Sequence, residues 1–302
     1  MTERPRIGLA TCKGHPGMMA GDDEALIETL EGMGFACERP RWDDAGVAWE
    51  GYDAVLIRTT WDYQERLESF LAWTERVAGR TRLWNPVEVV RANVDKRYLR
   101  LLEAAGASIV PTAWLEGSVS GAGIREALSG LGATRGAIKP VVGAGASGLM
   151  MFEASEAEAA AAHAQALIDA TGGAMAQAQI ESIRTRGELS VVLIEGEITH
   201  AVRKTPSAGE WRVQIEFGGR YELEAPGARE REIAMRAVEA LTVDETPLYA
   251  RVDLVEVAGV GPAVIEAELI EPELFFPMSA EAAEAMGRAL ARRLGVQLGS
   301  RA

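Results

Sequence analysis

The chain has 302 residues, 48% of them hydrophobic, which is enough for two or three packed domains. Its net charge of -14 argues against a nucleic acid or an anionic membrane as partner, because either would need a clustered basic face. The sequence has no long apolar stretch, and its start, MTERPRIGLATCKG, lacks the apolar segment of a signal peptide, which predicts a cytoplasmic protein. Two cysteines are too few for a disulfide framework or a cysteine zinc site.

The first part of the chain alternates strand and helix patterns, which is typical of an α/β protein. Residues 1–92 are therefore predicted to form a Rossmann-like βαβ domain. Its expected elements are strands at Arg6–Ala10, Phe35–Glu38 and Ala54–Arg58 and helices at Asp22–Met33 and Glu65–Ala78.

The patterns after residue 92 predict a central lobe over 93–180 and a C-terminal lobe over 181–302, so the fold class is α/β with an α+β second half. The central lobe is expected to hold a helix at Lys96–Ala105, a strand ending at Val110 and a small flap with its own helix over 135–179. In the C-terminal lobe we expect long strands at Glu188–His200 and Tyr249–Leu269 and helices at Arg229–Leu241 and Ala280–Leu294.

A glycine-rich stretch, AIKPVVGAGASGLMMF, spells G-x-G-x-x-G at Gly143, Gly145 and Gly148. A dinucleotide site would need a helix that opens within the glycines and an acidic residue about 20 positions later. Instead, the apolar run after Gly148 predicts a strand, and a capping box of Ser155 and Glu158 predicts the start of the next helix. The glycines therefore join two strands, either as a mobile flap over a polyphosphate or as an ordinary exposed turn.

A predicted hairpin, LYARVDLVEVAGVGPAVIEAELIEPELFF, carries the strongest constellation of charged residues. If its strands pair about the turn Gly259-Val260-Gly261, Asp253 lies opposite Glu266 and Arg251 lies opposite Glu268. Three carboxylates then converge, and a hard cation such as Mg²⁺ would relieve their repulsion. The alternative is an ion pair of Arg251 with Glu268 on a solvated face.

Two lysines extend this pattern. Lys139 ends a predicted strand just before the glycines, where it can reach phosphates held by the flap. Lys96 is expected in the first turn of a helix, where a cation opposes the helix dipole unless an anion binds nearby. The alternative for each is an ordinary surface lysine.

In this order the motifs resemble the ATP-grasp superfamily, and the resemblance covers the whole chain. The stretches IRTTWDY, NVDKRYL, GELSVVL, HAVRKTP and EAELIEPELFF are similar to its glutathione-synthetase-like branch, which includes the O-ureidoserine cyclo-ligase of D-cycloserine biosynthesis. The resemblance implies an ATP-grasp fold with a flap lobe and a C-terminal ATP-grasp lobe. It also implies ATP and Mg²⁺ as cofactors and an ADP-forming ligation, in which a carboxylate becomes an acyl phosphate and an amine displaces the phosphate.

The resemblance also implies roles for individual residues. For ATP it indicates Lys96, Lys139, Gly143, Gly145, Ser147, Gly148, the hinge residues Gln177, Gln179 and Ile180, and Glu188 at the ribose. For the metal it indicates Asp253, Glu266 and Glu268, although relatives usually carry Asn at the position of Glu268. As catalytic cations it indicates Arg203, Lys204 and Arg212, whose alternative is the solvated face of a strand pair.

The segment after the third expected strand is a candidate for the substrate pocket, because ligands gather beyond the carboxyl ends of strands in open α/β sheets. Its residues suit a small amino-acid-like molecule that carries both charges. The candidates are Arg58 for a carboxylate, Thr59 and Thr60 as hydrogen-bond donors, Asp62 for an ammonium group, and Trp61 and Tyr63 as walls. The alternative is an ordinary loop whose polar side chains cap the next helix.

Three classes of function remain open from the sequence. A ligase comes first, and the intact lysines and carboxylates favour it over a catalytically inactive ATP-binding module with a regulatory or structural role. A dehydrogenase is disfavoured because no helix follows the glycines. The expected partner is a small molecule, and a homodimer is common among relatives.

Overall fold

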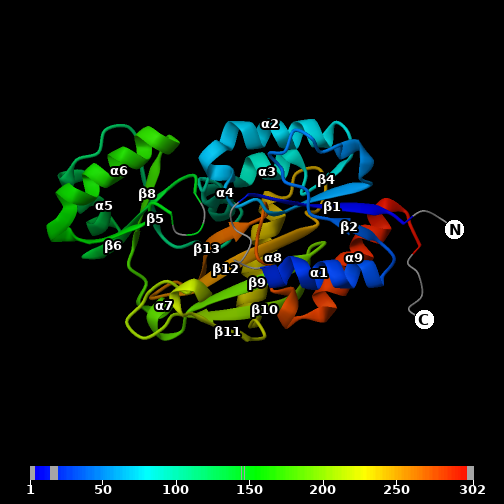
Figure 1. The fold of residues 1–302 in the computed structure, drawn as a ribbon. Coiled ribbons are helices and arrows are strands. Elements are labelled where there is room, and N and C mark those ends of the chain that lie inside the picture. The colour runs from blue at the N-terminus through cyan, green and yellow to red at the C-terminus, as the bar shows by residue number, and fades with distance from the viewer. Residues whose placement is uncertain (1–3, 14–19, 144, 146, 298–302) are drawn as a thin grey trace.

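The computed structural model describes residues 4–13, 20–143, 145 and 147–297. Within these ranges the chain forms three sheets that lie next to one another, with helices packed against them (Figure 1). Each sheet takes its strands from one stretch of the chain. The architecture is the mixed α/β fold that the sequence predicts.

The N-terminal sheet is parallel, with the strand order β2-β1-β3-β4. Both of its faces are covered, which explains the continuous apolar run AVLI in its third strand. Ala54 and Leu56 belong to a core with α1 and α9, whereas Val55 and Ile57 face α2 and α3. The elements are β1 (Arg6–Thr11), α1 (Ala20–Gly32), β2 (Ala36–Glu38), β3 (Ala54–Thr59), α2 (Leu67–Ala78), β4 (Arg82–Trp84), α3 (Val87–Asn93) and α9 (Ala280–Leu294).

The central lobe is an antiparallel sheet of order β5-β8-β6-β7, with two helices on one face. The alanine-rich helix α6 packs closely on this sheet because its small side chains leave little gap. The elements, including the helix that leads into the lobe, are α4 (Tyr98–Ala104), β5 (Thr112–Leu115), α5 (Gly121–Gly130), β6 (Arg135–Pro140), β7 (Met150–Glu153), α6 (Ala157–Thr171) and β8 (Ala174–Ala178).

The C-terminal sheet is antiparallel, with the order β11-β10-β9-β12-β13. Helix α8 packs on one face and α9 contacts the other, so the sheet is buried between them. Its elements are α7 (Glu181–Thr185), β9 (Glu188–Ile194), β10 (Glu197–Thr205), β11 (Arg220–Leu223), α8 (Ala228–Leu241), β12 (Tyr249–Val257) and β13 (Gly261–Glu268). Short 3₁₀ turns lie at Trp49–Gly51, Tyr63–Arg66, Ala154–Glu156, Ile215–Phe217 and Phe276–Met278.

The expected helices and strands are largely confirmed, but Lys96 and the strand at Val110 are corrections. Lys96 lies in the turn before α4 rather than in its first helical turn. No strand ends at Val110, because this segment meets the C-terminal sheet only through an isolated bridge between Ile109 and Val264. The first strand of the lobe begins later, at Thr112.

Two further local predictions differ from the structure. The segment Glu188–His200 is not one strand but part of a hairpin, because Glu195 and Gly196 have positive φ and turn the chain. The capping box before α6 is formed by Glu153 and Glu156, two residues earlier than expected, at the start of the 3₁₀ turn. The three-domain division of the sequence stays a prediction.

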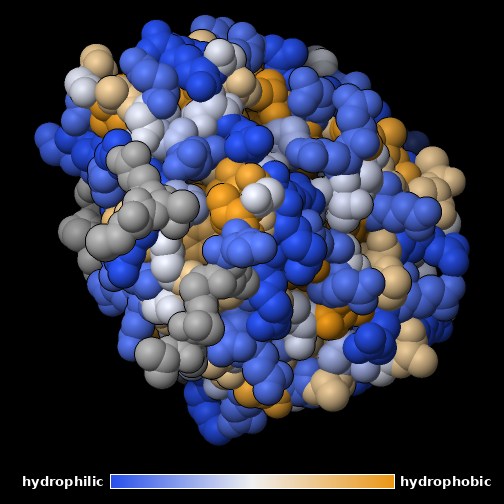
Figure 2. Space-filling view, turned by 90° about the vertical axis from the view of Figure 1, so that its right-hand side faces the viewer, coloured by the Kyte–Doolittle hydropathy of each residue, from blue (hydrophilic) through white to orange (hydrophobic). Residues whose placement is uncertain are grey.

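No helix in the described part of the chain is long and apolar enough to cross a membrane. Figure 2 shows one face of the molecule, which is mainly hydrophilic and carries its apolar side chains in small separate patches. The features that bear on function lie inside the molecule, where the sheets of the central and C-terminal parts meet.

Candidate active site

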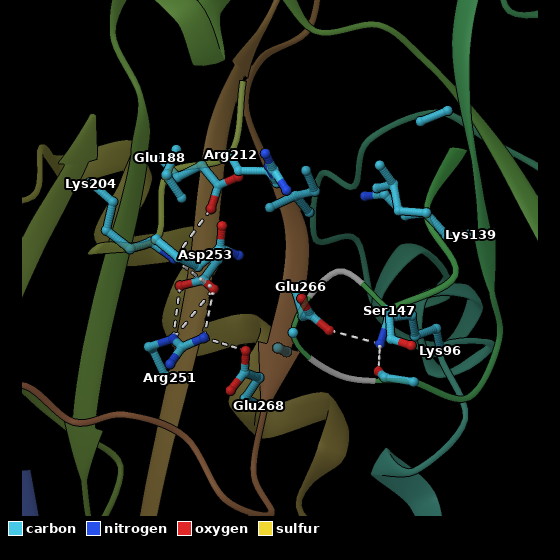
Figure 3. Close-up of a pocket in the computed structure, with 18 of the residues that line it drawn as sticks. Lys96, Lys139, Ser147, Glu188, Lys204, Arg212, Arg251, Asp253, Glu266 and Glu268 are labelled. Atoms are coloured by element: carbon cyan, nitrogen blue, oxygen red, sulfur yellow. Dashed lines mark hydrogen bonds and ion pairs between the residues drawn. The ribbon is translucent and has the colours of Figure 1, made fainter. Parts of the chain in front are cut away.

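A cavity of about 920 Å³ lies between the central-lobe sheet and the C-terminal sheet (Figure 3). Most of the residues that the sequence nominates line it: Trp61, Tyr63, Lys96, Lys139, Gly143, Gly145, Ser147, Gln177, Gln179, Ile180, Glu188, Lys204, Arg212, Asp253, Glu266 and Glu268. Six nominated residues are not part of its wall: Arg58, Thr59, Thr60, Asp62, Gly148 and Arg203.

The β12–β13 hairpin pairs as the sequence predicts at the positions that matter. Arg251 lies opposite Glu268 and Asp253 opposite Glu266, although a bulge between Asp253 and the turn shifts the pairs nearer the turn by one residue. The side-chain oxygens of Asp253, Glu266 and Glu268 come within 4.8 Å of one another. This cluster offers hard oxygen ligands at one point of the cavity wall.

Asp253 lies at the centre of a buried network of charges. Arg251 donates to its carboxylate at 3.0 Å, Lys204 lies 3.2 Å away, and the hydroxyl of Ser190 donates to it at 2.5 Å. Burial alone would raise the pKa of Asp253, but Arg251 and Lys204 outweigh burial and lower it. The carboxylate therefore stays ionised and available to a cation.

Glu268 forms an ion pair with Arg251, which was the alternative considered for the hairpin. The pair is not on a solvated face, because Arg251 is only 7% exposed and lies in the cavity wall. Burial raises the pKa of Glu268 to about 7, and the charge of Arg251 opposes this rise. Figure 3 shows Arg251 joined by dashed lines to the carboxylates of both Asp253 and Glu268.

Lys96 connects the metal-type cluster to the flap. Its Nζ lies 2.8 Å from Glu266 and donates to the carbonyl of Gly143 at 2.6 Å. Burial would lower the pKa of Lys96, but the charge of Glu266 outweighs it and raises the pKa. The turn before α4 thus places this cation beside both elements, whereas the sequence predicted Lys96 within the helix itself.

Lys139 differs from the other buried cations of the cavity. Its Nζ donates to Gln177 at 3.0 Å, and within the described chain it forms no ion pair with a carboxylate. Burial therefore lowers its pKa. A buried cation of this kind is suited to an anionic ligand such as a phosphate.

The glycines join β6 to β7 as an antiparallel hairpin, which confirms the strand–turn–strand prediction. Gly145 and Gly148 have positive φ, a conformation that favours glycine. The carbonyl of Gly148 contacts the ring of His163 at 2.8 Å rather than the cavity. Positions 144 and 146 of the predicted flap lie outside the described residues.

The hinge and the start of β9 complete the nucleotide-type wall. Gln179, Ile180 and Glu188 all face the cavity, and Glu188 lies 3.2 Å from Lys204. A side chain at Gly187 would clash, because its Cβ would lie 2.0 Å from the carbonyl of Lys204. The glycine of the GELSVVL motif therefore lets β9 approach β10 closely.

Strand alternation separates two of the nominated catalytic cations. Lys204 points into the cavity, whereas Arg203, the preceding residue of β10, points to the other face and pairs with Glu224 at 2.6 Å. Arg203 therefore cannot reach the same ligand, and its nomination is corrected. Arg212 lines the cavity with its guanidinium over the ring of Phe217 and 2.7 Å from Glu210.

The stretch IRTTWDY is only partly a wall of the cavity. Arg58 is 1% exposed and forms ion pairs with Asp22 at 2.8 Å and Asp23 at 3.1 Å. Its guanidinium is saturated by these partners, so the expectation that it binds the substrate carboxylate is corrected.

Three neighbours of Arg58, namely Thr59, Thr60 and Asp62, are corrected because they do not line the cavity. Thr59 bonds to Thr11 at 2.7 Å, and Thr60 is fully buried. Asp62 accepts from the indole of Trp42 at 2.7 Å, pairs with Arg66 and does not line the cavity, so it is not placed to bind a substrate ammonium group. Trp61 and Tyr63, which were expected as walls, do line the cavity.

Three cavity residues were missed as functional candidates: Arg251, Glu271 and Glu273. Arg251 was considered only as an ion-pair partner, although the same register that paired it with Glu268 also placed it beside Asp253. Glu271 and Glu273 follow β13, where the period of the strand no longer predicts direction. The one sequence signal for Glu271 and Glu273 is that they follow directly after Glu266 and Glu268, the carboxylates of the hairpin.

These residues fit a nucleoside triphosphate with Mg²⁺. The three carboxylates supply oxygen ligands, and Lys139 supplies a buried positive charge without an acidic partner in the described chain. Ile180 and Ile183 add an apolar surface near the hinge. An antiparallel flap lobe facing a sheet that carries these groups defines an ATP-grasp ligase, which joins a carboxylate to an amine and forms ADP.

Comparisons with known proteins agree with this class. Residues 7–85 match the N-terminal domain of D-cycloserine synthetase DcsG, and residues 124–272 match the ATP-grasp domain of prokaryotic glutathione synthetase. The cycloserine biosynthesis protein DcsG of Streptomyces lavendulae is 32% identical over 90% of this chain and 94% of its own. The chain therefore belongs to the D-cycloserine synthetase DcsG family of ATP-grasp ligases.

Solved structures show the same relationship. The crystal structure of D-cycloserine synthetase DcsG superposes with a TM-score of 0.86 at 31% identity, covering 96% of this chain and 99% of the other. The ATP-grasp ligase PsnB, in a complex with a precursor variant, Mg and ADP, has a TM-score of 0.64 at 14% identity, covering 95% and 98%. At that identity PsnB supports the fold alone.

Proposed function

We propose that the cavity binds ATP with Mg²⁺ and that the enzyme activates the carboxylate of a small amino-acid-like substrate, whose own nitrogen then closes a ring. One observation carries the proposal: the oxygens of Asp253, Glu266 and Glu268 lie within 4.8 Å of one another in a cavity that also holds Lys96 and Lys139. Ring closure, as opposed to ligation of two molecules, is supported by the likeness to D-cycloserine synthetase along most of the chain.

The nucleotide would lie between the flap and the C-terminal sheet. Lys139 is placed to bind its phosphates, and the flap residues Gly145 and Ser147 line the same space. Ile180 and Gln179 form the wall suited to the base, and Glu188 is the candidate for the ribose hydroxyls. These roles follow the polarity of the wall, which changes from charged to apolar toward the hinge.

Asp253, Glu266 and Glu268 would hold Mg²⁺, which when bound neutralises charge on the transferring phosphoryl group. Arg251 now lies between Asp253 and Glu268, and Lys96 lies against Glu266. These cations keep the cluster from repelling itself in the protein alone. When Mg²⁺ binds, it would therefore take the place of some of these ion pairs, because the three carboxylates already have cations beside them in the protein alone.

The residues around the cluster favour transfer from ATP to a carboxylate. Lys204 is buried and fixed by Glu188 and Asp253, so its charge is already positioned where negative charge develops. Arg212 is the second cation on that wall. The substrate nitrogen then forms a bond to the acyl carbon while the bond from carbon to phosphate oxygen breaks. Closure of the flap would keep water from hydrolysing the acyl phosphate.

The test is ADP formation by the purified protein with Mg²⁺, ATP and a panel that includes O-ureido-D-serine and ordinary D- and L-amino acids. We expect turnover with a substrate that carries its own nucleophile and none with Glu266→Ala, whose circular dichroism should be unchanged. ADP formation by Glu266→Ala at the wild-type rate would refute the metal assignment. ATP binding without turnover of any substrate would favour the alternative, an inactive ATP-binding module.

We retain two proposals about the whole protein, a cytoplasmic location and a homodimer, because relatives commonly form dimers. Light scattering on the purified protein tests the second, and a monomer across the micromolar range would refute it.

A further inference from the structure

Glu271 stands out among the acidic residues of the cavity. It follows β13 by three positions, lines the cavity and is only 7% exposed. Within the described chain it forms no ion pair, and burial raises the pKa of its carboxyl group to about 8, against which the charge of Lys96 and its own backbone N–H act. A carboxylate that is nine-tenths buried without a partner loses hydration and gains nothing in return.

Four other acids of the cavity wall have cations beside them, whereas Glu273 forms no ion pair in the described chain but is less deeply buried than Glu271. Glu188 and Asp253 pair with Lys204, Glu266 pairs with Lys96, and Glu268 pairs with Arg251. The cavity wall thus has one half with ion-paired carboxylates around the metal-type cluster and another half, at Glu271, whose carboxyl group has no ion pair in the described chain. The latter half is suited to a cation brought by the ligand.

The backbone around Glu271 is held in place by side chains from other elements. Trp61 donates to the carbonyl of Glu271 at 3.2 Å, Arg58 donates to that of Pro272 at 3.0 Å, and Arg251 donates to that of Glu273 at 3.2 Å. The backbone that carries this carboxylate is therefore held in place beside the cavity. Such pre-organisation is typical of a binding residue.

The walls beside this carboxylate fit a small organic cation. Trp61 and Tyr63 line the same cavity, and burial together with the nearby charge of Glu271 raises the pKa of Tyr63 well above its ordinary value. Tyr63 therefore stays neutral beside Glu271. A hydrated metal ion would find a single buried carboxylate here, whereas an ammonium group on a short carbon chain would meet both the charge and the aromatic walls.

We propose that the Glu271 carboxylate binds the α-ammonium group of the substrate. This inference deepens the proposed function and rests on it. The substrate carboxylate that is activated must lie at the metal-type cluster, and the substrate ammonium group would then lie at Glu271, three residues after the end of β13. It replaces Asp62, which the sequence nominated for this role and which is occupied by Trp42 and Arg66. Glu271 would thereby select amino acids over hydroxy acids and simple carboxylates.

The experiment compares Glu271→Gln with wild type and with Glu232→Gln, which removes the same charge from the exposed face of α8. Two probes are used, O-ureido-D-serine and its analogue with hydroxyl in place of the α-amino group. For the first probe we expect Glu271→Gln to raise KM roughly 10- to 100-fold while the Kd of an ATP analogue is unchanged. For the analogue, wild type and Glu271→Gln should perform equally, and Glu232→Gln should match wild type throughout.

A purely structural role gives a different result. Because Glu271 has no partner to lose, Glu271→Gln should keep or raise the Tm, whereas a structural role would lower it. Equal losses with both probes, an unchanged KM, or a changed Mg²⁺ requirement would each overturn the inference.

A binding assay separates this inference from the proposed function if no turnover is found. Thermal shifts are measured with an ATP analogue and matched pairs, D-serine against D-glycerate and D-alanine against propionate. We expect the ammonium-bearing member of a pair to raise the Tm more in wild type and this difference to vanish in Glu271→Gln. If no pair differs in wild type, the inference fails, whatever the outcome of the ADP assay.

Discussion

The guanidinium of Arg58 donates a hydrogen bond of 3.0 Å to the backbone carbonyl of Pro272, 214 residues away in the sequence. The same guanidinium is paired with Asp22, whose carboxylate accepts the backbone N–H groups of Leu274 and Phe276 at 2.8 and 2.7 Å. Arg58 therefore shapes the substrate side of the cavity without touching it. It is a positioning residue for the segment that carries Glu271.

Replacing Arg58 with Met is expected to destabilise the fold by about 3–5 kcal/mol, because Asp22 and Asp23 would remain buried without their cation. Urea unfolding followed by circular dichroism measures this. Arg80→Met, which breaks the exposed pair with Glu50, is the control and should cost about 1 kcal/mol or less. Equal effects of the two changes would contradict the network described for Arg58.

Lys139→Met should weaken the binding of an ATP analogue by roughly 10- to 100-fold, since it removes a charge-assisted contact to phosphate. Stability should be unchanged or higher, because burial lowers the pKa of Lys139 and no carboxylate in the described chain loses an ion pair. Calorimetric titration and the Tm measure the two effects. Arg135→Met, on the same strand but exposed and paired with Glu153, should alter neither greatly.

Lys204→Met and Arg203→Met test the two faces of β10. Removing Lys204 should lower kcat by about 10²- to 10³-fold, because a fixed cation at the phosphoryl-transfer site is lost. Removing Arg203 should leave kcat within about threefold and cost roughly 1–3 kcal/mol of stability through its contact with Glu224. Steady-state kinetics with saturating ATP measures both effects. A large loss of kcat in Arg203→Met would mean that Arg203 does act in the active site.

His200 should make stability depend on pH. Burial lowers its pKa from 6.5 to about 4, so the unfolded chain takes up a proton first as the pH falls. The free energy of unfolding attributable to His200 is therefore fully present above about pH 6.5 and is lost progressively toward pH 4. Urea titrations at pH 8 and pH 5 should show a smaller loss in His200→Gln than in wild type. An equal loss would mean that His200 does not contribute.

The sequence predicts the metal-type cluster well because one local rule places it. A hairpin pairs residues about its turn, and a bulge between the turn and Asp253 shifts the register by one residue, which brings Asp253 opposite Glu266 as the predicted turn centre also does. Lys139 and the flap follow in the same way from neighbouring strands. The same reasoning could have separated Arg203 from Lys204, since adjacent residues of a strand face opposite sides.

The substrate side could not be predicted in this way. Whether Arg58 faces a ligand or a buried acid depends on Asp22 and Asp23. These two residues lie on α1, 36 and 35 positions before Arg58 in the sequence. The direction of Glu271 depends on contacts from Trp61, Arg58 and Arg251. No periodic pattern encodes such tertiary contacts, so only the structure distinguishes the residues that bind from those that hold them.

The pairing of α1 with the segment 274–291 constrains how this chain folds. Ile7, Leu9, Leu26 and Leu30 share one hydrophobic core with Phe276, Met286 and Leu290, and 252 residues separate Asp22 from its partner Leu274. During synthesis the parallel sheet therefore emerges with one face uncovered, and its core is complete only after residues 274–291 have been made. Truncation before residue 274 would leave an exposed apolar layer and would remove the backbone N–H groups of Leu274 and Phe276 that Asp22 accepts, so the N-terminal half is expected to need chaperones until the chain is complete.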